Sequence, residues 1–223
     1  MEASTQPSDG VAPAVPQHTH IALVVDRSSS MGSHRRATVD AINSNIEAIR
    51  SQVLSSADHQ LTTVSLVTFG TDVRTEFWMQ SPNDLKPWDY GSYNPNGMTA
   101  LLDGVGKTLA RFRDSEYGND LNSSFLVIAI TDGEENSSIE YKNTRKFGSL
   151  LEEMQGTERY SVALMVPRGH REVLVRRFGI PEGNVSEWET TSQGLERATS
   201  TTRSATSSYL KSRSSGVRST RSF

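Results

Sequence analysis

Three short, uninterrupted apolar runs constrain the fold more than any other feature of this chain. They span residues 20–25, 125–130 and 160–166, and Val, Ile, Leu and Ala supply most of their side chains. An uninterrupted run of this length is typical of a strand buried on both faces, because a strand with one face in water alternates apolar and polar residues. Such strands occur in parallel sheets that helices cover on both sides. The runs therefore predict an α/β fold.

Between these runs, the period of the apolar residues changes to that of a helix. Apolar residues recur at three- and four-residue spacings, which places them on one helical face. Residues 61–69 and 73–79 are also strand-like, and the short turn between them predicts a hairpin. Residues 185–188 predict a last short strand. The predicted helices span residues 39–53, 101–112, 147–154, 171–178 and 194–210.

Composition and charge set the expected organisation of the chain. The 223 residues include no cysteine, which excludes disulfides, cysteine zinc sites, iron–sulfur clusters and thiol nucleophiles. No apolar run approaches the roughly 20 residues that span a bilayer. Residues 1–17 are polar and contain three prolines, so we expect them to form a disordered extension and not a signal peptide. We therefore expect a cytoplasmic protein. Residues 211–223 carry four basic residues and no acidic one, so we expect a flexible tail after one folded domain of residues 18–210.

Short oxygen-bearing side chains fall where the predicted strands end. Asp26, Ser28 and Ser30 follow the first buried strand, Thr99 precedes the second helix, and Asp132 follows the run at 125–130. The carboxyl ends of parallel strands meet at one edge of a sheet, where ligands bind. Oxygen donors alone suit a hard cation such as Mg²⁺. Neutral hydroxyls would leave much of its charge uncancelled, so the ion could accept one more anionic oxygen from another protein.

The three segments together resemble a known family. DRSSSM at 26–31 resembles the Asp-x-Ser-x-Ser motif of von Willebrand factor A domains, GMTALLD at 97–103 resembles their threonine-bearing loop, and ITDGEEN at 130–136 their Asp-Gly loop. In that family the three motifs form a metal-ion-dependent adhesion site, and the resemblance covers residues 18–210. It implies a three-layer αβα, Rossmann-like fold with a six-stranded, mostly parallel sheet and one antiparallel edge strand. A bacterial or phage-type intracellular member is expected.

The resemblance also implies a role for each residue of the predicted site. Ser28 and Ser30 would bind Mg²⁺ directly, with Mn²⁺ or Ca²⁺ as alternatives. Thr99 would bind the ion directly or through water, and Asp26 and Asp132 would hold coordinated waters. The implied function is a non-enzymatic interaction module that binds an Asp or Glu of a partner protein through the ion. One alternative is a structural subunit of a phage or stress-response assembly, located in the virion if phage-encoded. The other is a Mg²⁺-dependent phosphoesterase, for which the sequence offers no placed base or nucleophile.

Aromatic and charged residues near the predicted site are candidates for contact with a partner. Aromatic side chains on an exposed rim make good anchors, although they can equally pack against the domain. The predicted partner-binding residues are Trp88, Tyr90, Tyr93, Glu134 and Arg35.

Two other sequence features have simpler interpretations than the ligands they suggest. GVGKT at 104–108 resembles the end of a phosphate-binding loop, but residue 101 is Leu instead of Gly and the segment lies in a predicted helix, so no nucleotide is expected. Four charges on the tail give only weak, salt-sensitive attraction, so nucleic acid is not an expected partner.

The residues of the predicted metal site also have an alternative interpretation. The Ser and Thr hydroxyls could simply cap the helices that follow them, and Asp132-Gly133 could form a plain turn.

Overall fold

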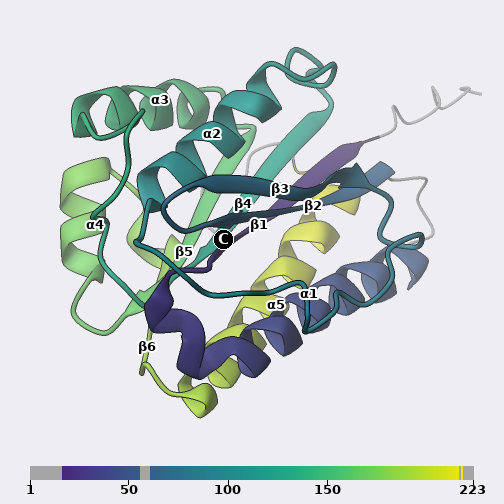
Figure 1. Ribbon diagram of the computed structural model, residues 1–223. Helices are drawn as coiled ribbons and strands as arrows, with labels where there is room; N and C mark the ends of the chain where they lie inside the picture. Colours follow the sequence, from purple (N-terminus) through teal and green to yellow (C-terminus); the bar gives the residue numbers. More distant parts are fainter. Residues whose placement is uncertain (1–16, 56–60, 216, 218–223) are drawn as a thin grey trace, which may run out of the picture.

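The computed structural model describes residues 17–55, 61–215 and 217, which form three layers with a six-stranded sheet in the middle (Figure 1). The strand order is β3-β2-β1-β4-β5-β6. Neighbouring strands are parallel, apart from β2 and β3, which pair antiparallel at one edge. The predicted fold class, including its antiparallel edge strand, is therefore confirmed. The strands are β1 (His18–Asp26), β2 (Leu61–Phe69), β3 (Val73–Gln80), β4 (Ser123–Ile130), β5 (Tyr160–Pro167) and β6 (Val185–Trp188).

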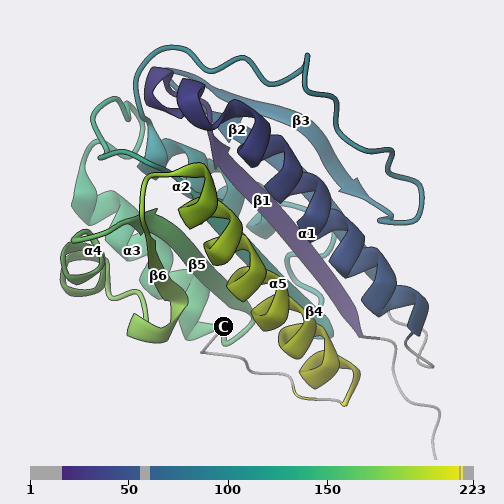
Figure 2. The ribbon, with the colours of Figure 1, turned by 90° about the horizontal axis from the view of Figure 1, so that it is seen from below.

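Two groups of helices cover the sheet. Helices α1 and α5 lie side by side over one face, as Figure 2 shows, and α2, α3 and α4 lie over the other. The described helices are α1 (Arg35–Ser55), α2 (Leu101–Arg113), α3 (Thr144–Gly156), α4 (Arg171–Phe178) and α5 (Ser192–Ser214), with two short 3-10 helices, η1 (Ser29–His34) and η2 (Glu182–Asn184).

The central strand β1 shows why its sequence is apolar without interruption. Ala22 and Val24 pack in the core beneath α2, α3 and α4, whereas Leu23 and Val25 pack in the core beneath α1 and α5. All four side chains are fully buried. Successive side chains of a strand point to opposite faces, so a sheet covered on both sides needs an apolar residue at every position.

Helix α5 is longer than the sequence predicts. It runs to Ser214, four residues beyond the predicted end at Leu210, so the expected boundary of the flexible tail was wrong. The reason is Arg213, whose side chain is buried and whose guanidinium donates hydrogen bonds to the main-chain oxygens of Asn122 and Val217 at 3.1 and 2.9 Å. These bonds fix the last turn of the helix against the start of the sheet.

The remaining predictions about the ends fall mostly on residues that the structure does not describe. The expected disorder of the extension concerns residues 1–16, and that of the tail concerns 216 and 218–223, all of which lie outside the described residues. Within the described part of the chain, no helix is both long and apolar enough to cross a membrane.

Candidate metal centre

The topology brings three separate loops to one point at the carboxyl edge of the sheet. The strand order reverses between the adjacent strands β1 and β4, so the chain leaves them in opposite directions, and ligands of open α/β sheets bind at such a point. The segment before α2 joins them, because Ser29 N–H donates to Gly97 O at 3.0 Å and Asn96 N–H donates to Arg27 O at 2.7 Å. The two sequence motifs at 26–31 and 97–103 are thereby held against each other.

A continuous set of oxygen atoms links the loops after β1 and β4. The hydroxyl oxygens of Ser28 and Ser30 lie 3.0 Å apart, and Ser30 donates a hydrogen bond to Asp132 Oδ1 at 2.7 Å. Thr99 lies next to this set, since a β-carbon placed on Gly133 would be 3.3 Å from Thr99 Oγ1 and 3.9 Å from Ser30 Oγ. Ser28 and Thr99 are buried, whereas Ser30 is exposed, so the cluster opens to solvent on the Ser30 side.

Asp26 lies beneath these oxygens and is fully buried. Its Oδ1 accepts a hydrogen bond from Ser28 N–H at 2.7 Å, and its Oδ2 accepts one from the Thr131 hydroxyl at 2.6 Å. Burial raises the pKa of Asp26 to about 6, although both hydrogen bonds act in the opposite direction. Among the described residues, no Lys, Arg or His forms an ion pair with it. A cation in the adjacent hydroxyl cluster would supply the positive charge that this carboxylate lacks.

The spacing and chemistry of these donors fit a small octahedral cation. Mg²⁺ binds oxygen at about 2.0–2.1 Å, which places neighbouring ligands of an octahedron about 3 Å apart. The Ser28–Ser30 and Ser30–Asp132 oxygen pairs, at 3.0 and 2.7 Å, are close to that spacing. The described residues contain no group of three or more His, Cys, Asp or Glu side chains that could hold a metal. Binding here would therefore depend on hydroxyl oxygens, which favours a hard cation.

Two residues that the sequence analysis did not single out fix the positions of the predicted ligands. Thr131 holds Asp26 as described above. Asn136 holds Thr99, because its side-chain oxygen accepts from Thr99 N–H at 2.9 Å and its own N–H donates to Thr99 O at the same distance. Both lie within the ITDGEEN segment, so their position in that motif is the signal that could have identified them.

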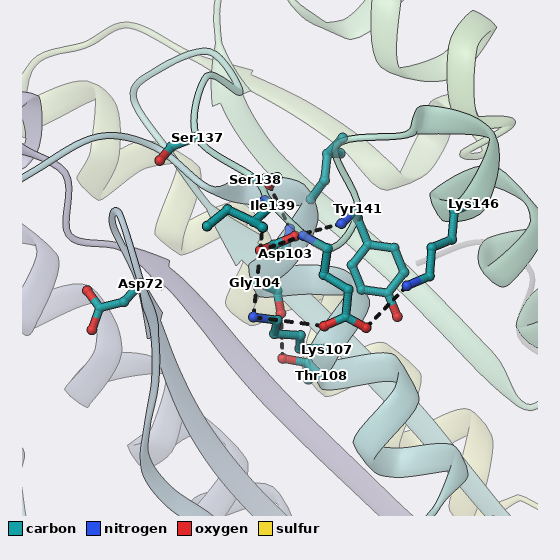
Figure 3. Close-up of polar contacts among 12 residues, drawn as sticks. Asp72, Asp103, Gly104, Lys107, Thr108, Ser137, Ser138, Ile139, Tyr141 and Lys146 are labelled. Atoms are coloured by element: carbon teal, nitrogen blue, oxygen red, sulfur yellow. Dashed lines mark hydrogen bonds and ion pairs between the residues drawn. The ribbon is translucent and has the colours of Figure 1, made fainter.

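A second pair of missed residues, Asp103 and Glu135, fastens the loop after β4 to the start of α2, and Figure 3 shows Asp103 beside this loop. Asp103 accepts main-chain N–H groups from Tyr141, Ile139 and Glu140 at 2.8, 3.1 and 3.3 Å. Burial acts to raise the pKa of Asp103, but these three donors, together with the charge of Lys107, lower it overall. The signal in the sequence is a carboxylate inside the apolar stretch LLDGV, where burial requires that its oxygens find donors.

Glu135 completes this fastening from the loop side. Its Oε2 accepts from Leu102 N–H and from the Ser138 hydroxyl, each at 2.8 Å, and its Oε1 accepts from Ser138 N–H at 2.7 Å. The carboxylate thus occupies the N-terminus of α2, where free N–H groups and the helix dipole favour negative charge. The GVGKT segment at 104–108 lies within α2 and is not a phosphate-binding loop. Its Lys107 Nζ lies 3.6 Å from Asp103 Oδ2 in the same helix (Figure 3).

The predicted partner-binding residues differ in exposure, and Tyr93 was assigned wrongly. Tyr93 is fully buried, and its hydroxyl donates to the main-chain oxygen of Asp26, so it supports the loop after β1. Its ring packs against that of Trp88, with centroids 5.8 Å apart, and Trp88 is half-buried. The sequence left open whether the aromatic residues of this loop face a partner or pack against the domain; Tyr93 packs against the domain because the loop folds back over α1, where Trp88 exchanges hydrogen bonds with Asn43.

The other three predicted residues are exposed. Tyr90 donates its hydroxyl to Asp40, and Arg35 donates to the main-chain oxygen of Tyr90 at 2.7 Å. Glu134 Oε1 lies 4.0 Å from His170 Nε2. These contacts hold Tyr90 and Arg35 together at the start of α1 and place Glu134 toward α4, so a partner could meet either group.

Comparison with known proteins gives the same architecture. The family model described as "von Willebrand factor type A domain" matches residues 20–187. A search of curated proteins found no match. Among solved structures, proximal thread matrix protein 1 from the mussel byssus has a TM-score of 0.60 at 20% identity over 86% of this chain. This chain covers 47% of the mussel protein, about half of its length.

Two further structures extend the comparison. A second structure of the mussel protein, described as having a zinc-occupied MIDAS motif, has a TM-score of 0.58 at 18% identity, covering 86% of this chain and 46% of that one. The pilus adhesin SpaC from Lactobacillus rhamnosus GG, in an open conformation, has a TM-score of 0.65 at 13% identity, covering 88% of this chain and 31% of the adhesin. Likenesses at these identities show the fold, while the family model covers most of the sequence. This chain belongs to the von Willebrand factor type A domain family.

Proposed function

We propose that this domain binds Mg²⁺ at Asp26, Ser28, Ser30, Thr99 and Asp132, and that the bound ion in turn binds an acidic side chain of a partner protein. The observation that carries the proposal is the run of oxygens from Ser28 through Ser30 to Asp132, spaced at 3.0 and 2.7 Å above a buried carboxylate. These residues come from two strand ends and one helix start, and only the folded sheet brings them together.

The donor set supports an adhesive role rather than a closed structural site. Ser28, Ser30 and Thr99 would supply neutral oxygens. Asp26 already accepts a hydrogen bond on each oxygen, so we assign its contribution to charge and to water-mediated contact. Two carboxylates at most then balance the ion. Because Ser30 and the face beside it are exposed, an Asp or Glu from outside can approach the remaining coordination position.

The choice of Mg²⁺ follows from the all-oxygen donors, and Mn²⁺ or Ca²⁺ suits the same atoms. The mussel neighbour holds zinc in its MIDAS motif, so zinc belongs in the test as a competitor. The family and its adhesin-like neighbours support protein interaction as the general function. The cytoplasmic location inferred from the sequence stays a prediction.

Isothermal calorimetry with Mg²⁺ and Mn²⁺ tests the metal site, with Zn²⁺ as competitor. We expect Ser28→Ala and Ser30→Ala each to weaken metal binding at least about tenfold, because each removes one direct ligand. Ser29→Ala is the matched control, since Ser29 lies between the two ligands with an exposed side chain. Equal metal affinity in all four proteins would overturn the site.

The partner and the phosphoesterase alternative need separate assays. We expect proteins retained by the immobilised domain in Mg²⁺ to be released by EDTA, and not to be retained by Ser28→Ala. Metal-dependent hydrolysis of p-nitrophenyl phosphate that Ser28→Ala abolishes would instead favour an enzyme. Retention that is indifferent to EDTA would contradict the proposed role of the ion.

A further inference from the structure

A cavity of about 700 Å³ lies between the loop after β4, the start of α2 and helix α4. It is next to the proposed metal ligands Ser28, Ser30, Thr99 and Asp132, whose oxygens we call the metal cluster. Its volume is within the range of sites that bind small ligands or side chains. Leu101, Leu102, Val166, Leu174 and Phe178 form its floor, and each is buried. Two more apolar side chains on its walls, Ile139 and Val173, are 80% and 56% exposed. An apolar group from another molecule could therefore be buried here.

Two cations and two carboxylates, Glu134 and Glu135, are among the residues that line this cavity. Lys142 and Arg177 line it and are exposed. Within the part of the chain that the structure describes, neither has a carboxylate within ion-pair distance; Arg177 donates to the Thr144 hydroxyl at 3.5 Å and its guanidinium lies 5.7 Å from the centre of the Phe178 ring. The nearby cations Lys107, Lys146 and Arg171 do have carboxylate partners. Lys142 and Arg177 are thus free to bind an anionic group from outside.

The cavity and the metal cluster share a wall. Gly133 lines the cavity, and a β-carbon at that position would lie 3.3 Å from Thr99 Oγ1. A partner segment whose carboxylate binds beside Ser30 and Thr99 would therefore also lie next to the opening of the cavity. The loop that forms this wall is fixed in position, because Asp103 and Glu135 accept main-chain hydrogen bonds from it and hold residues 137–141 against α2.

We propose that this cavity, which we name the α4 pocket, selects the partner by binding a segment with a defined chemistry. The segment carries the acidic residue that binds the metal, an apolar side chain within a few residues that enters the pocket, and a second acidic residue that pairs with Lys142 and Arg177. This inference rests on the proposed function, since the metal fixes the first acidic residue. Glu134, 4.0 Å from His170, lies at the boundary and disfavours acidic residues between the two sites.

Selection from a phage-displayed library of ten-residue peptides with one fixed central Asp, on the intact protein in Mg²⁺, tests the α4 pocket. We expect selected peptides to share a Leu, Ile, Met or Phe near the Asp and a further Asp or Glu beyond it. In the best peptide, changing the apolar residue to Ala is expected to weaken binding about tenfold or more. The double variant Lys142→Glu/Arg177→Glu should weaken it about tenfold, since two attractive rim charges become repulsive.

The control variant is Arg145→Glu/Arg197→Glu, which changes the net charge equally at exposed cations outside the pocket and should alter affinity less than about twofold. Equal losses in both double variants, selected peptides without a shared apolar position, or no selected peptide at all would overturn the α4 pocket. Binding that EDTA leaves intact but Lys142→Glu/Arg177→Glu weakens would refute the metal-dependent function while locating the peptide in the pocket. Binding that EDTA abolishes but Lys142→Glu/Arg177→Glu leaves unchanged would refute the pocket alone.

Discussion

Removal of the Asp103 carboxylate should destabilise the domain by an amount that its hydrogen bonds define. The carboxylate accepts three main-chain N–H groups, of which that of Tyr141 is buried and those of Ile139 and Glu140 are partly open to water. A hydrogen bond to a charged group contributes about 1.5–3 kcal/mol, so one full and two half contributions amount to roughly 3–6 kcal/mol. We expect Asp103→Ala to lower the free energy of unfolding by about 3 kcal/mol, the lower end, because the bond to Glu140 is long.

Urea denaturation in EDTA measures this loss without a contribution from bound metal. Asp103→Asn keeps one acceptor oxygen and should lose less than Asp103→Ala. Glu140→Ala is the control: Glu140 lies in the same loop and pairs with Lys146 at 3.3 Å on the surface, so its removal should cost less than about 1 kcal/mol. A loss below about 1 kcal/mol in Asp103→Ala would show that the three hydrogen bonds do not hold the loop.

The pH dependence gives an independent check on the charge of Asp103. Its pKa in the folded protein is lowered, so the ionised carboxylate stabilises the fold above the ordinary Asp pKa of about 4 and this contribution is lost as pH falls through the folded pKa. The difference in stability between wild type and Asp103→Asn should therefore shrink on acidification. A difference that stays constant down to pH 3 would refute an ionised Asp103.

Three further predictions concern other parts of the domain. Burial lowers the pKa of His20 from 6.5 to about 4. The free energy of unfolding should therefore fall by about 3 kcal/mol as the pH is lowered from 6.5 to 4. An NMR titration of the ring that gave a pKa near 6.5 would contradict this. Gly133→Val should weaken Mg²⁺ binding about tenfold in calorimetry, because its side chain would crowd Thr99 Oγ1; undiminished affinity would argue against Thr99 as a ligand. Arg213→Ala should lower the free energy of unfolding by about 2–4 kcal/mol, because the main-chain oxygen of Asn122 loses its charged donor, whereas a loss under 1 kcal/mol would mean that the end of α5 is held otherwise.

The strands and helices of this domain follow closely from local sequence. Uninterrupted apolar runs occur because helices cover both faces, and the changes of period between runs mark the helices. The end of α5 could not be predicted in this way. Arg213 is a polar residue in a Ser-rich segment, and its burial depends on main-chain oxygens at positions 122 and 217 that no periodicity reveals.

The oxygens of the candidate site and their meeting at one edge of the sheet were predictable, but the contacts of the residues that support them were not. The motifs identify Ser28, Ser30 and Asp132 by their place after strands, and the structure brings these side chains into contact. Tyr93 was misjudged because the acceptor of its hydroxyl, the Asp26 carbonyl, lies 67 positions away in the chain. Asp103 was overlooked for a related reason, since its three donors follow it by 36 to 38 positions.

The contact between Ser30 and Asp132 spans 102 positions of the chain, and it exists because β1 pairs with β4. During synthesis, β4 must therefore leave the ribosome before Asp132 can meet the Ser28 and Ser30 hydroxyls of the proposed metal site. Contacts of such long separation form late and slowly compared with local ones. A nascent or truncated chain that ends before β4 holds Asp26, Ser28, Ser30 and Thr99 but lacks Asp132, so the proposed metal site can be complete only when the centre of the sheet has formed.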